Sequence, residues 1–213
     1  MKFSQISLGM LLALFCVFFS IQSAMAAPDS DSGLELRIGL NAPVFKATID
    51  GDIDFKSDTD TIAGFGMTFS LGYRFMFMGV YLEQNLAGIF GEQNYDYEDS
   101  RFYGSTYGTL RFIGSFDWLE LEGGVGLGAM YMVSAHPDIM LDADGSASSA
   151  VCFAMKFTIG ATARFGGFGV GLHLDYELGI NPQSFEVPPM IPKVDVMQLL
   201  HNVQPGIHFL YKF

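Results

Sequence analysis

An alternation of apolar residues with small or polar ones is the feature that most constrains how this chain can fold. The clearest example is the segment 119–133, in which Leu119, Leu121, Val125 and Leu127 alternate with Glu and Gly. Because successive side chains of a strand point to opposite faces, this period of two predicts a β-strand with one apolar face. The pattern defines eight predicted strands, at residues 34–45, 61–73, 78–90, 104–116, 119–133, 151–165, 168–180 and 199–213.

Long and short connections between these strands alternate along the chain. The short ones allow only tight turns, so the strands they join must be antiparallel, and all the long connections fall at the opposite end. The segment 78–90 is the least regular, because Gln84 interrupts its apolar face, and we expect a bulge near it. The long connections are 46–60, 91–103, 134–150 and 181–198, and the short ones are 74–77, 117–118 and 166–167.

The distribution of apolar residues indicates which face of the strands lies outside. Half of the residues are hydrophobic and the mean hydropathy is +0.30, yet no apolar run after Ile21 is long enough for a transmembrane helix. The second face of the strands is mostly Gly, Ser, Thr and Ala, whereas a water-exposed face would be rich in charged residues. The sequence therefore predicts an all-β, eight-stranded antiparallel up-and-down transmembrane β-barrel, apolar outside and narrow inside, rather than a soluble lipocalin-like barrel.

The charges predicted to face the lumen nearly balance, as expected because confined charges are costly unless they are paired. The acids are Glu35, Glu83, Glu120, Glu122, Asp175 and Glu177, and the bases are Arg37, Arg111, Lys156, Arg164 and Lys212. Aromatic residues are predicted to form a girdle at each membrane interface. The girdle near the short turns comprises Tyr73, Phe75, Phe77, Phe116, Trp118, Phe165, Phe168, Tyr211 and Phe213, and that near the long loops comprises Phe45, Phe90, Tyr131, Phe153 and Tyr176.

The net charge of −12 lies mostly in the long connections and argues against a nucleic-acid partner. The run Asp50-Gly51-Asp52-Ile53-Asp54 suggests a calcium loop, but the sixth and twelfth positions hold Phe55 and Thr61 where an EF-hand has Gly and Glu. A solvated acidic loop is the favoured interpretation, with weak binding of divalent cations as the alternative. We expect no metal site and no cofactor.

The last predicted strand places Ile207, Phe209, Tyr211 and Phe213 on one face and ends there. This ending resembles the closing strand of bacterial outer-membrane β-barrels, and with the eight-strand rhythm the chain resembles the small members of that class, the OmpA-like transmembrane domain and OmpX-like proteins. The resemblance implies a Gram-negative outer membrane, contact with its lipids and lipopolysaccharide, and insertion by the barrel-assembly machinery. It also implies tight turns in the periplasm and long loops at the cell surface.

Residues 1–26 have the features of a cleaved signal peptide. Lys2 precedes the apolar stretch Leu8–Ile21, and Ala24-Met25-Ala26 forms a small-x-small cleavage site. We therefore expect export, after which residues 27–213 form the outer-membrane β-barrel. That mature chain holds one cysteine, Cys152, so it can form no intrachain disulfide, and we interpret the thiol as a small filler side chain.

One group of residues could support catalysis. His173 and Asp175 share the polar face of a predicted strand, with Glu177 beyond them, and a nearby hydroxyl could complete a nucleophilic site. The candidate serines are Ser70 and Ser105. Pairing of these groups with Lys156 and Arg164 inside the lumen is the simpler interpretation, and we favour it.

These observations predict a structural or surface-interaction role carried by four acidic extracellular loops, where an extracellular ligand or protein would bind. We predict no catalytic residue and no enzyme activity. Two alternatives remain open. Glycines on the lumen face suggest a small pore for ions or solutes, and the His173 group suggests, less strongly, a lipid-modifying outer-membrane enzyme.

Overall fold

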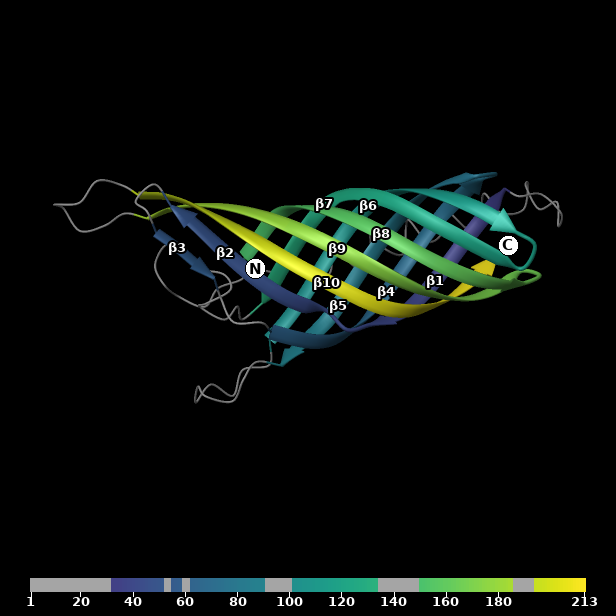
Figure 1. The fold of residues 1–213 in the computed structure, drawn as a ribbon, viewed down its shortest axis with the longest axis horizontal. Coiled ribbons are helices and arrows are strands. Elements are labelled where there is room, and N and C mark those ends of the chain that lie inside the picture. The colour runs from purple at the N-terminus through teal and green to yellow at the C-terminus, as the bar shows by residue number, and fades with distance from the viewer. Residues whose placement is uncertain (1–31, 52–54, 59–61, 91–100, 134–149, 186–193) are drawn as a thin grey trace, which may run out of the picture.

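A computed structural model describes residues 32–51, 55–58, 62–90, 101–133, 150–185 and 194–213. These residues form ten antiparallel strands in one sheet that curls into a barrel (Figure 1). The strands are β1 (Gly33–Asn41), β2 (Val44–Gly51), β3 (Phe55–Asp58), β4 (Ile62–Phe75), β5 (Met78–Phe90), β6 (Arg101–Phe116), β7 (Leu119–Val133), β8 (Ala150–Phe165), β9 (Phe168–Phe185) and β10 (Val194–Lys212). Among the described residues, no helix is long and apolar enough to cross a membrane.

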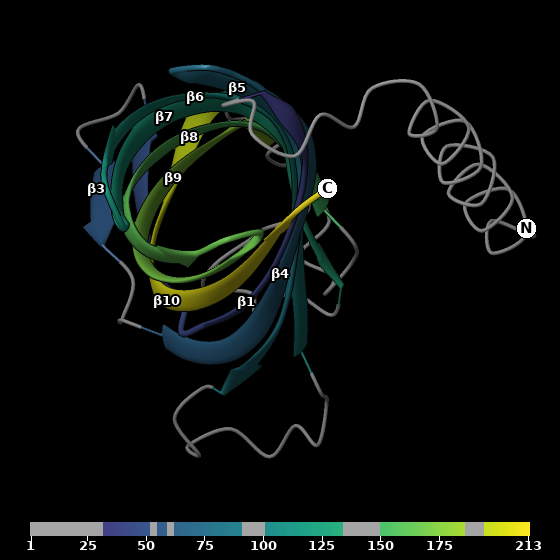
Figure 2. The ribbon, with the colours of Figure 1, turned by 90° about the vertical axis from the view of Figure 1, so that its right-hand side faces the viewer.

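The sheet closes because β1 pairs with the last strand, β10, on one side and with β4 on the other. Ile38 lies opposite Phe209 of β10 on one side and opposite Phe69 of β4 on the other. The end-on view shows the resulting ring of strands (Figure 2). From β4 to β10 each strand pairs with the next one in sequence, so the barrel is antiparallel and up-and-down, as predicted.

β1 and β2 together make one barrel strand, which gives eight strands around the ring. The register with β10 is the same before and after the interruption, since Asn41 lies opposite Gly206 and Val44 opposite Val203. The ladder is interrupted at Pro43, which has no N–H to donate. The backbone groups beside it are still used, because Ala42 N donates to Pro205 O at 3.0 Å and Gly64 N donates to Pro43 O at 2.8 Å.

The strands on one side of the barrel extend into segments that the sequence pattern predicts as loops. β2 pairs with β10 as far as Gly51, and the short β3 pairs with β2. β9 and β10 remain paired up to Phe185 and Val194. Backbone hydrogen bonds hold these extensions in the sheet, although the apolar outward-facing pattern of the predicted strands does not continue into their sequence. The predicted loops at 46–60 and 181–198 are therefore shorter than expected.

The bulge expected in the segment 78–90 is not present. β5 pairs with β4 from Ala63–Phe90 to Phe75–Met78 without a shift in register, and its pairing with β6 is equally regular. The side chain of Gln84 stays on the outward face, where its amide forms hydrogen bonds with neighbouring groups. No bulge is therefore needed to turn this polar side chain inward.

Three two-residue turns join the strands at the end opposite the long connections. The first turn residues have left-handed backbone angles: φ is 54° at Met76, 51° at Asp117 and 64° at Gly166. This conformation suits two-residue hairpins and is easiest for glycine. The turns confirm the short connections, with one correction: Arg74 lies within β4 and its buried side chain points into the lumen.

The two faces of the barrel wall have the predicted character. Large apolar side chains, including Phe157, Ile159 and Leu172, cover the outside, whereas the lumen is polar. The girdle near the short turns is confirmed by strongly exposed Phe116, Trp118, Phe165 and Phe168. Phe45 is a correction, because it is 1% exposed and lies in the lumen. The strand alternation continues through Pro43, so an odd-numbered residue there faces inward.

Candidate functional site: the lumen

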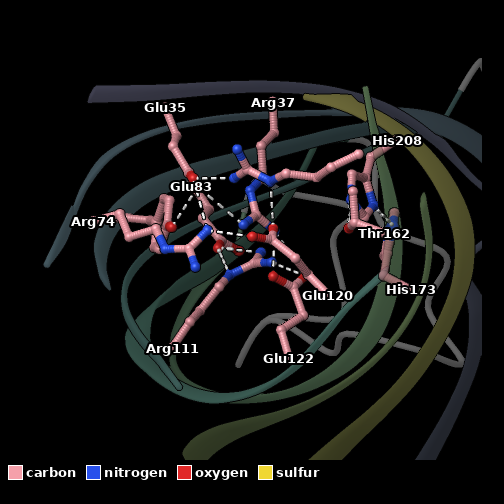
Figure 3. Close-up of polar contacts among 12 residues, drawn as sticks. Glu35, Arg37, Arg74, Glu83, Arg111, Glu120, Glu122, Thr162, His173 and His208 are labelled. Atoms are coloured by element: carbon pink, nitrogen blue, oxygen red, sulfur yellow. Dashed lines mark hydrogen bonds and ion pairs between the residues drawn. The ribbon is translucent and has the colours of Figure 1, made fainter. Parts of the chain in front are cut away.

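Ten charged side chains fill the part of the lumen nearer the short turns, and we call them the charge network. Five are acidic and five are basic, so the network as a whole is neutral. The position of most of them is shown in Figure 3. The members are Glu35, Arg37, Arg74, Glu83, Arg111, Glu120, Glu122, Lys156, Arg164 and Asp175.

The network is continuous, because most members contact two partners of opposite sign. Arg164 joins Glu120 to Glu35, and Glu35 also contacts Arg37 and Arg74. The other N···O distances are 2.5 Å for Arg74–Glu120, 2.5 Å for Arg37–Glu122, 2.6 Å for Arg111–Glu122, 2.5 Å for Arg111–Glu83, 2.7 Å for Lys156–Glu83 and 2.6 Å for Lys156–Asp175. This pairing offsets the cost of placing the charges away from water.

Tyr81 lies at the centre of the network. Its hydroxyl donates to Glu35 Oε2 at 2.7 Å. The guanidinium carbons of Arg37 and Arg111 lie 4.9 and 5.3 Å from its ring centroid, which is the range of cation–π contacts. The ring is accommodated because Gly72 and Gly79 have no side chains where it lies.

A second layer of side chains, built around Glu177, lies in the lumen nearer the long loops. Its carboxylate accepts hydrogen bonds from Tyr103 OH, from Asn85 Nδ2 at 2.8 Å and from Asn202 Nδ2 at 2.9 Å. Beside it lies a buried cluster that we call the aromatic plug. Its residues are Phe45, Ala87, Ile89, Tyr103, Tyr107, Met130, Cys152, Ala154 and Leu200.

A pair of histidines lies beside the charge network. His173 Nδ1 is 3.3 Å from His208 Nδ1, and His208 Nε2 is 2.9 Å from the hydroxyl of Thr162. His173 Nε2 lies 3.9 Å from Asp175 Oδ2. A small cavity here has room for about one water molecule. It is lined by Arg37, Gly39, Thr68, Ser70, Arg111, His173, Asp175 and His208.

The sequence-based candidates for catalysis are only partly brought together. Ser70 lines the same cavity as His173, but its hydroxyl has no hydrogen-bond partner among the described residues, and His173 contacts His208 instead. Ser105 lies elsewhere, bonded to Asn85 and Glu177. The predicted pairing of Asp175 with Lys156 is confirmed, whereas Arg164 pairs with Glu120 and Glu35.

Three features of the lumen were not predicted from the sequence. The first is Arg74, which was assigned to a turn. The second is the contact between His173 and His208, because the alternation within each strand does not show how far neighbouring strands are shifted along one another. The third is the pair of tyrosines Tyr81 and Tyr103. Their contacts with carboxylates become predictable only when one notes that both tyrosines and the carboxylates occupy inward-facing positions of their strands. In the described part of the chain, no three His, Cys, Asp or Glu side chains are grouped so as to hold a metal ion.

Two groups of polar side chains make contacts on the outward face, one around Gln84 and one at Tyr176. Gln84 Nε2 donates to Tyr131 OH at 2.6 Å, and Thr106 donates to Gln84 Oε1 at 2.7 Å. Closer to the long loops, Tyr176 OH lies 2.7 Å from His201 Nδ1. In the sequence, Gln84 interrupts an apolar face and Tyr176 is a predicted girdle residue, but the partners of these two residues were not predicted.

Comparison with solved structures supports the architecture. No protein-family model matches the sequence, and no curated protein matches it. Among solved structures, the outer membrane protein OprG from Pseudomonas aeruginosa is 14% identical, covers 88% of this chain and 99% of its own, and superimposes with a TM-score of 0.53. This chain has the fold of a small eight-stranded outer-membrane β-barrel.

Two further structures resemble the barrel at lower TM-scores. Neisserial surface protein A is 12% identical over 83% of this chain and 97% of its own, with a TM-score of 0.41. Ail, the attachment invasion locus protein of Yersinia pestis, is 15% identical over 82% and 99%, with a TM-score of 0.38. The barrel fold and its apolar outer surface support localisation in the outer membrane.

Proposed function

We propose that the protein is an outer-membrane barrel with a closed lumen, whose role is structural or is carried by binding at its long-loop end. The observation that carries this proposal is the filling of the lumen at two levels. The charge network occupies one level, and Glu177 with the aromatic plug occupies the other. Eight strands enclose an interior that side chains can fill, and the cavity that the described residues line beside His173 and His208 holds only about one water.

The electrostatics of the network also support a filling role. An ion-conducting pore needs charged side chains that are free to bind the passing ion. Here Glu83 and Glu122 are each already paired with two basic side chains. Moving one of these side chains to admit an ion leaves buried charges without partners, which costs several kcal/mol. The function is therefore assigned to the surface, where the acidic connections place most of the negative charge.

Planar-bilayer recording of the purified barrel tests the closed lumen. We expect no stable current steps across repeated insertions, with insertion verified by heat-modifiable gel mobility. Steady unitary currents from the inserted wild type would overturn the proposal in favour of the pore.

We also propose that the barrel is not an enzyme, because among the described residues His173 contacts His208 and Asp175 and is hydrogen-bonded to no hydroxyl. Mass spectrometry of lipid A from cells that express wild type or His173→Ala tests this directly. We expect identical lipid A in both, and in cells without the protein. A lipid A species that depends on His173 would establish catalysis.

Delivery to this membrane is the remaining part of the proposal. Residues 1–26 would direct export and be removed, after which the assembly machinery inserts residues 27–213 among outer-membrane lipids and lipopolysaccharide. Amino-terminal sequencing of the protein from outer-membrane fractions is expected to begin at Ala27. An intact Met1 in that fraction would contradict this assignment.

A further inference from the structure

Four of the eight residues that line the small cavity beside the histidine pair offer it no open polar side-chain atom. Gly39 has no side chain, and the Thr68 hydroxyl both accepts and donates a hydrogen bond. Each guanidinium nitrogen of Arg111 donates to a carboxylate. His208 uses both of its ring nitrogens. These side chains therefore shape the cavity without binding anything inside it.

The other four lining residues each have one polar atom without a hydrogen-bond partner among the described residues. These open atoms are Arg37 Nε, Ser70 Oγ, His173 Nε2 and Asp175 Oδ1. None of the four residues is more than 7% exposed. Because a buried polar atom without a partner is costly, four of them around one cavity indicate that the cavity binds a ligand.

Closure of the barrel brings the open atoms together from strands that are far apart in the sequence. Arg37 of β1 lies directly opposite Ser70 of β4, and His173 and Asp175 are buried on the same face of β9. β1 and β9 both pair with β10, which places His208 between them. The two histidines lie at one side of the charge network (Figure 3). The cavity therefore depends on the closed ring of strands.

The chemistry of the open atoms determines the class of ligand. Arg37 Nε can only donate a hydrogen bond, and Asp175, which is paired with Lys156, can only accept one. An anion in the cavity would lie against the Asp175 carboxylate, and a cation would lie against the Arg37 guanidinium. A water molecule is neutral, accepts and donates, and fits a cavity with room for about one water.

The positions of the protons on the two neutral histidine rings follow from their neighbours. His173 Nε2 lies 3.9 Å from Asp175 Oδ2, and a lone pair there would face the carboxylate, so Nε2 carries the ring proton. His173 Nδ1 then accepts the proton of His208 Nδ1, which lies 3.3 Å away. His208 Nε2 in turn accepts from the Thr162 hydroxyl at 2.9 Å. His173 Nε2 is therefore a second donor for a ligand in the cavity.

We propose that the cavity binds one water molecule, which joins the histidine pair to the charge network. The water accepts hydrogen bonds from Arg37 Nε and His173 Nε2. It donates hydrogen bonds to Ser70 Oγ and Asp175 Oδ1, so every open atom gains a partner. It also bridges the 3.9 Å between His173 and Asp175, which is too long for a direct hydrogen bond. The water thereby holds His173 in one tautomer.

Nuclear magnetic resonance of the mature barrel in detergent micelles, with isotope-labelled histidine rings, tests the site. A ring nitrogen that carries a proton and one that lacks it have well-separated chemical shifts. We expect His173 to carry its proton on Nε2 and His208 to carry its proton on Nδ1. We also expect a cross-peak between the Nε2 proton of His173 and a bound water.

Two variants and one titration show whether the cross-peak comes from this cavity. Ser70→Val replaces the hydroxyl with methyl groups that fill the cavity, so the cross-peak should be lost. Thr109→Val is the matched control, because Thr109 is a buried hydroxyl without a described partner that does not line the cavity. It should retain the cross-peak. Addition of bromide should leave the His173 signals of the wild type unchanged.

Two wild-type results would overturn the site without any variant. One is a His173 ring with its proton on Nδ1, and the other is a spectrum without the water cross-peak. A Nε2 proton that exchanges too fast to be seen counts as the second result, because such a proton faces bulk water. These readings decide the question even if Ser70→Val does not fold.

The variants and the titration can overturn the site as well. Persistence of the cross-peak in folded Ser70→Val would do so, and so would its loss in Thr109→Val. A saturable shift of the His173 signals with bromide would show that an anion occupies the cavity instead of water. The inference does not depend on the membrane placement or on the role of the long connections. A conducting barrel that keeps these signals overturns only the closed lumen, and a silent barrel that lacks them overturns only the water site.

Discussion

Arg37 on β1 and Glu122 on β7 meet across the lumen, with Arg37 Nη1 2.5 Å from Glu122 Oε2. The two strands are not neighbours in the sheet, so this ion pair connects opposite parts of the wall. Both partners are almost fully buried, and each has a second partner, Glu35 and Arg111 respectively. Balance within the whole network therefore matters more than any one pair.

Loss of one charge should destabilise the barrel more than loss of an opposite pair. Arg37→Met leaves the network with an excess negative charge and should lower the free energy of unfolding by about 3–5 kcal/mol. Arg37→Met/Glu122→Met restores neutrality, because Glu35 keeps Arg164 and Arg111 keeps Glu83. Reversible urea unfolding in lipid vesicles measures both. A double variant that is less stable by the sum of the two single losses would contradict this coupling.

Replacement of Gly72 by alanine should disturb the network through Tyr81. A Cβ at Gly72 would lie far inside van der Waals contact with the Tyr81 ring and with the Val80 carbonyl. We expect a loss of about 1–3 kcal/mol. Gly108→Ala is the matched control, since the nearest atom to its Cβ is Leu127 O at 4.0 Å. The same urea assay should show Gly108→Ala close to wild type, and equal losses would refute the steric explanation.

The turn residues Met76 and Asp117 offer a test of backbone strain. Both have positive φ, which costs an L-residue about 1–2 kcal/mol and is better tolerated by Asp than by Met. Met76→Gly should therefore stabilise the barrel, and Asp117→Gly should stabilise it less. Urea midpoints of the two variants give the comparison. The reverse order would show that contacts of the Met76 side chain outweigh its backbone strain.

Gln84 and Tyr131 should behave as a coupled pair on the lipid-facing wall. Gln84→Leu removes the group to which Tyr131 is bonded, and a polar group left without a partner in lipid is costly. We expect a loss of about 1 kcal/mol that Gln84→Leu/Tyr131→Phe recovers in part. A double-mutant cycle in vesicles measures the coupling, which should be absent between Gln84→Leu and Tyr211→Phe.

Most strands of the barrel wall could be predicted from the sequence, but few of the contacts inside the lumen could be. Alternation defined the strands because the membrane demands an apolar face at every second position, as at Leu119–Val133. It failed in the extensions of β2 and β9, where the backbone pairing with β10 continues beyond the predicted strands. Phe45 was assigned by residue type to a girdle, although the alternation that includes Ile38 and Leu40 places it inside.

Contacts across the lumen depend on the stagger between strands, which the sequence does not display. The inward orientation of Glu122 and Arg37 followed from alternation, but their meeting required the barrel to be closed in one register. The pairing of His173 with His208 had the same origin. The near balance of positive and negative charge in the lumen was predictable from the sequence, but the individual ion pairs were not.

The unequal strand lengths have a consequence for how the protein meets its surroundings. β10 and β9 comprise 19 and 18 residues, whereas β5 comprises 13 (Figure 1). Among the described residues, the wall of the barrel is therefore longest at β9 and β10, whose pairing continues as far as Phe185 and Val194. In the proposed orientation, a macromolecule that approaches the barrel from outside the cell would meet this sidewall before it reaches the mouth.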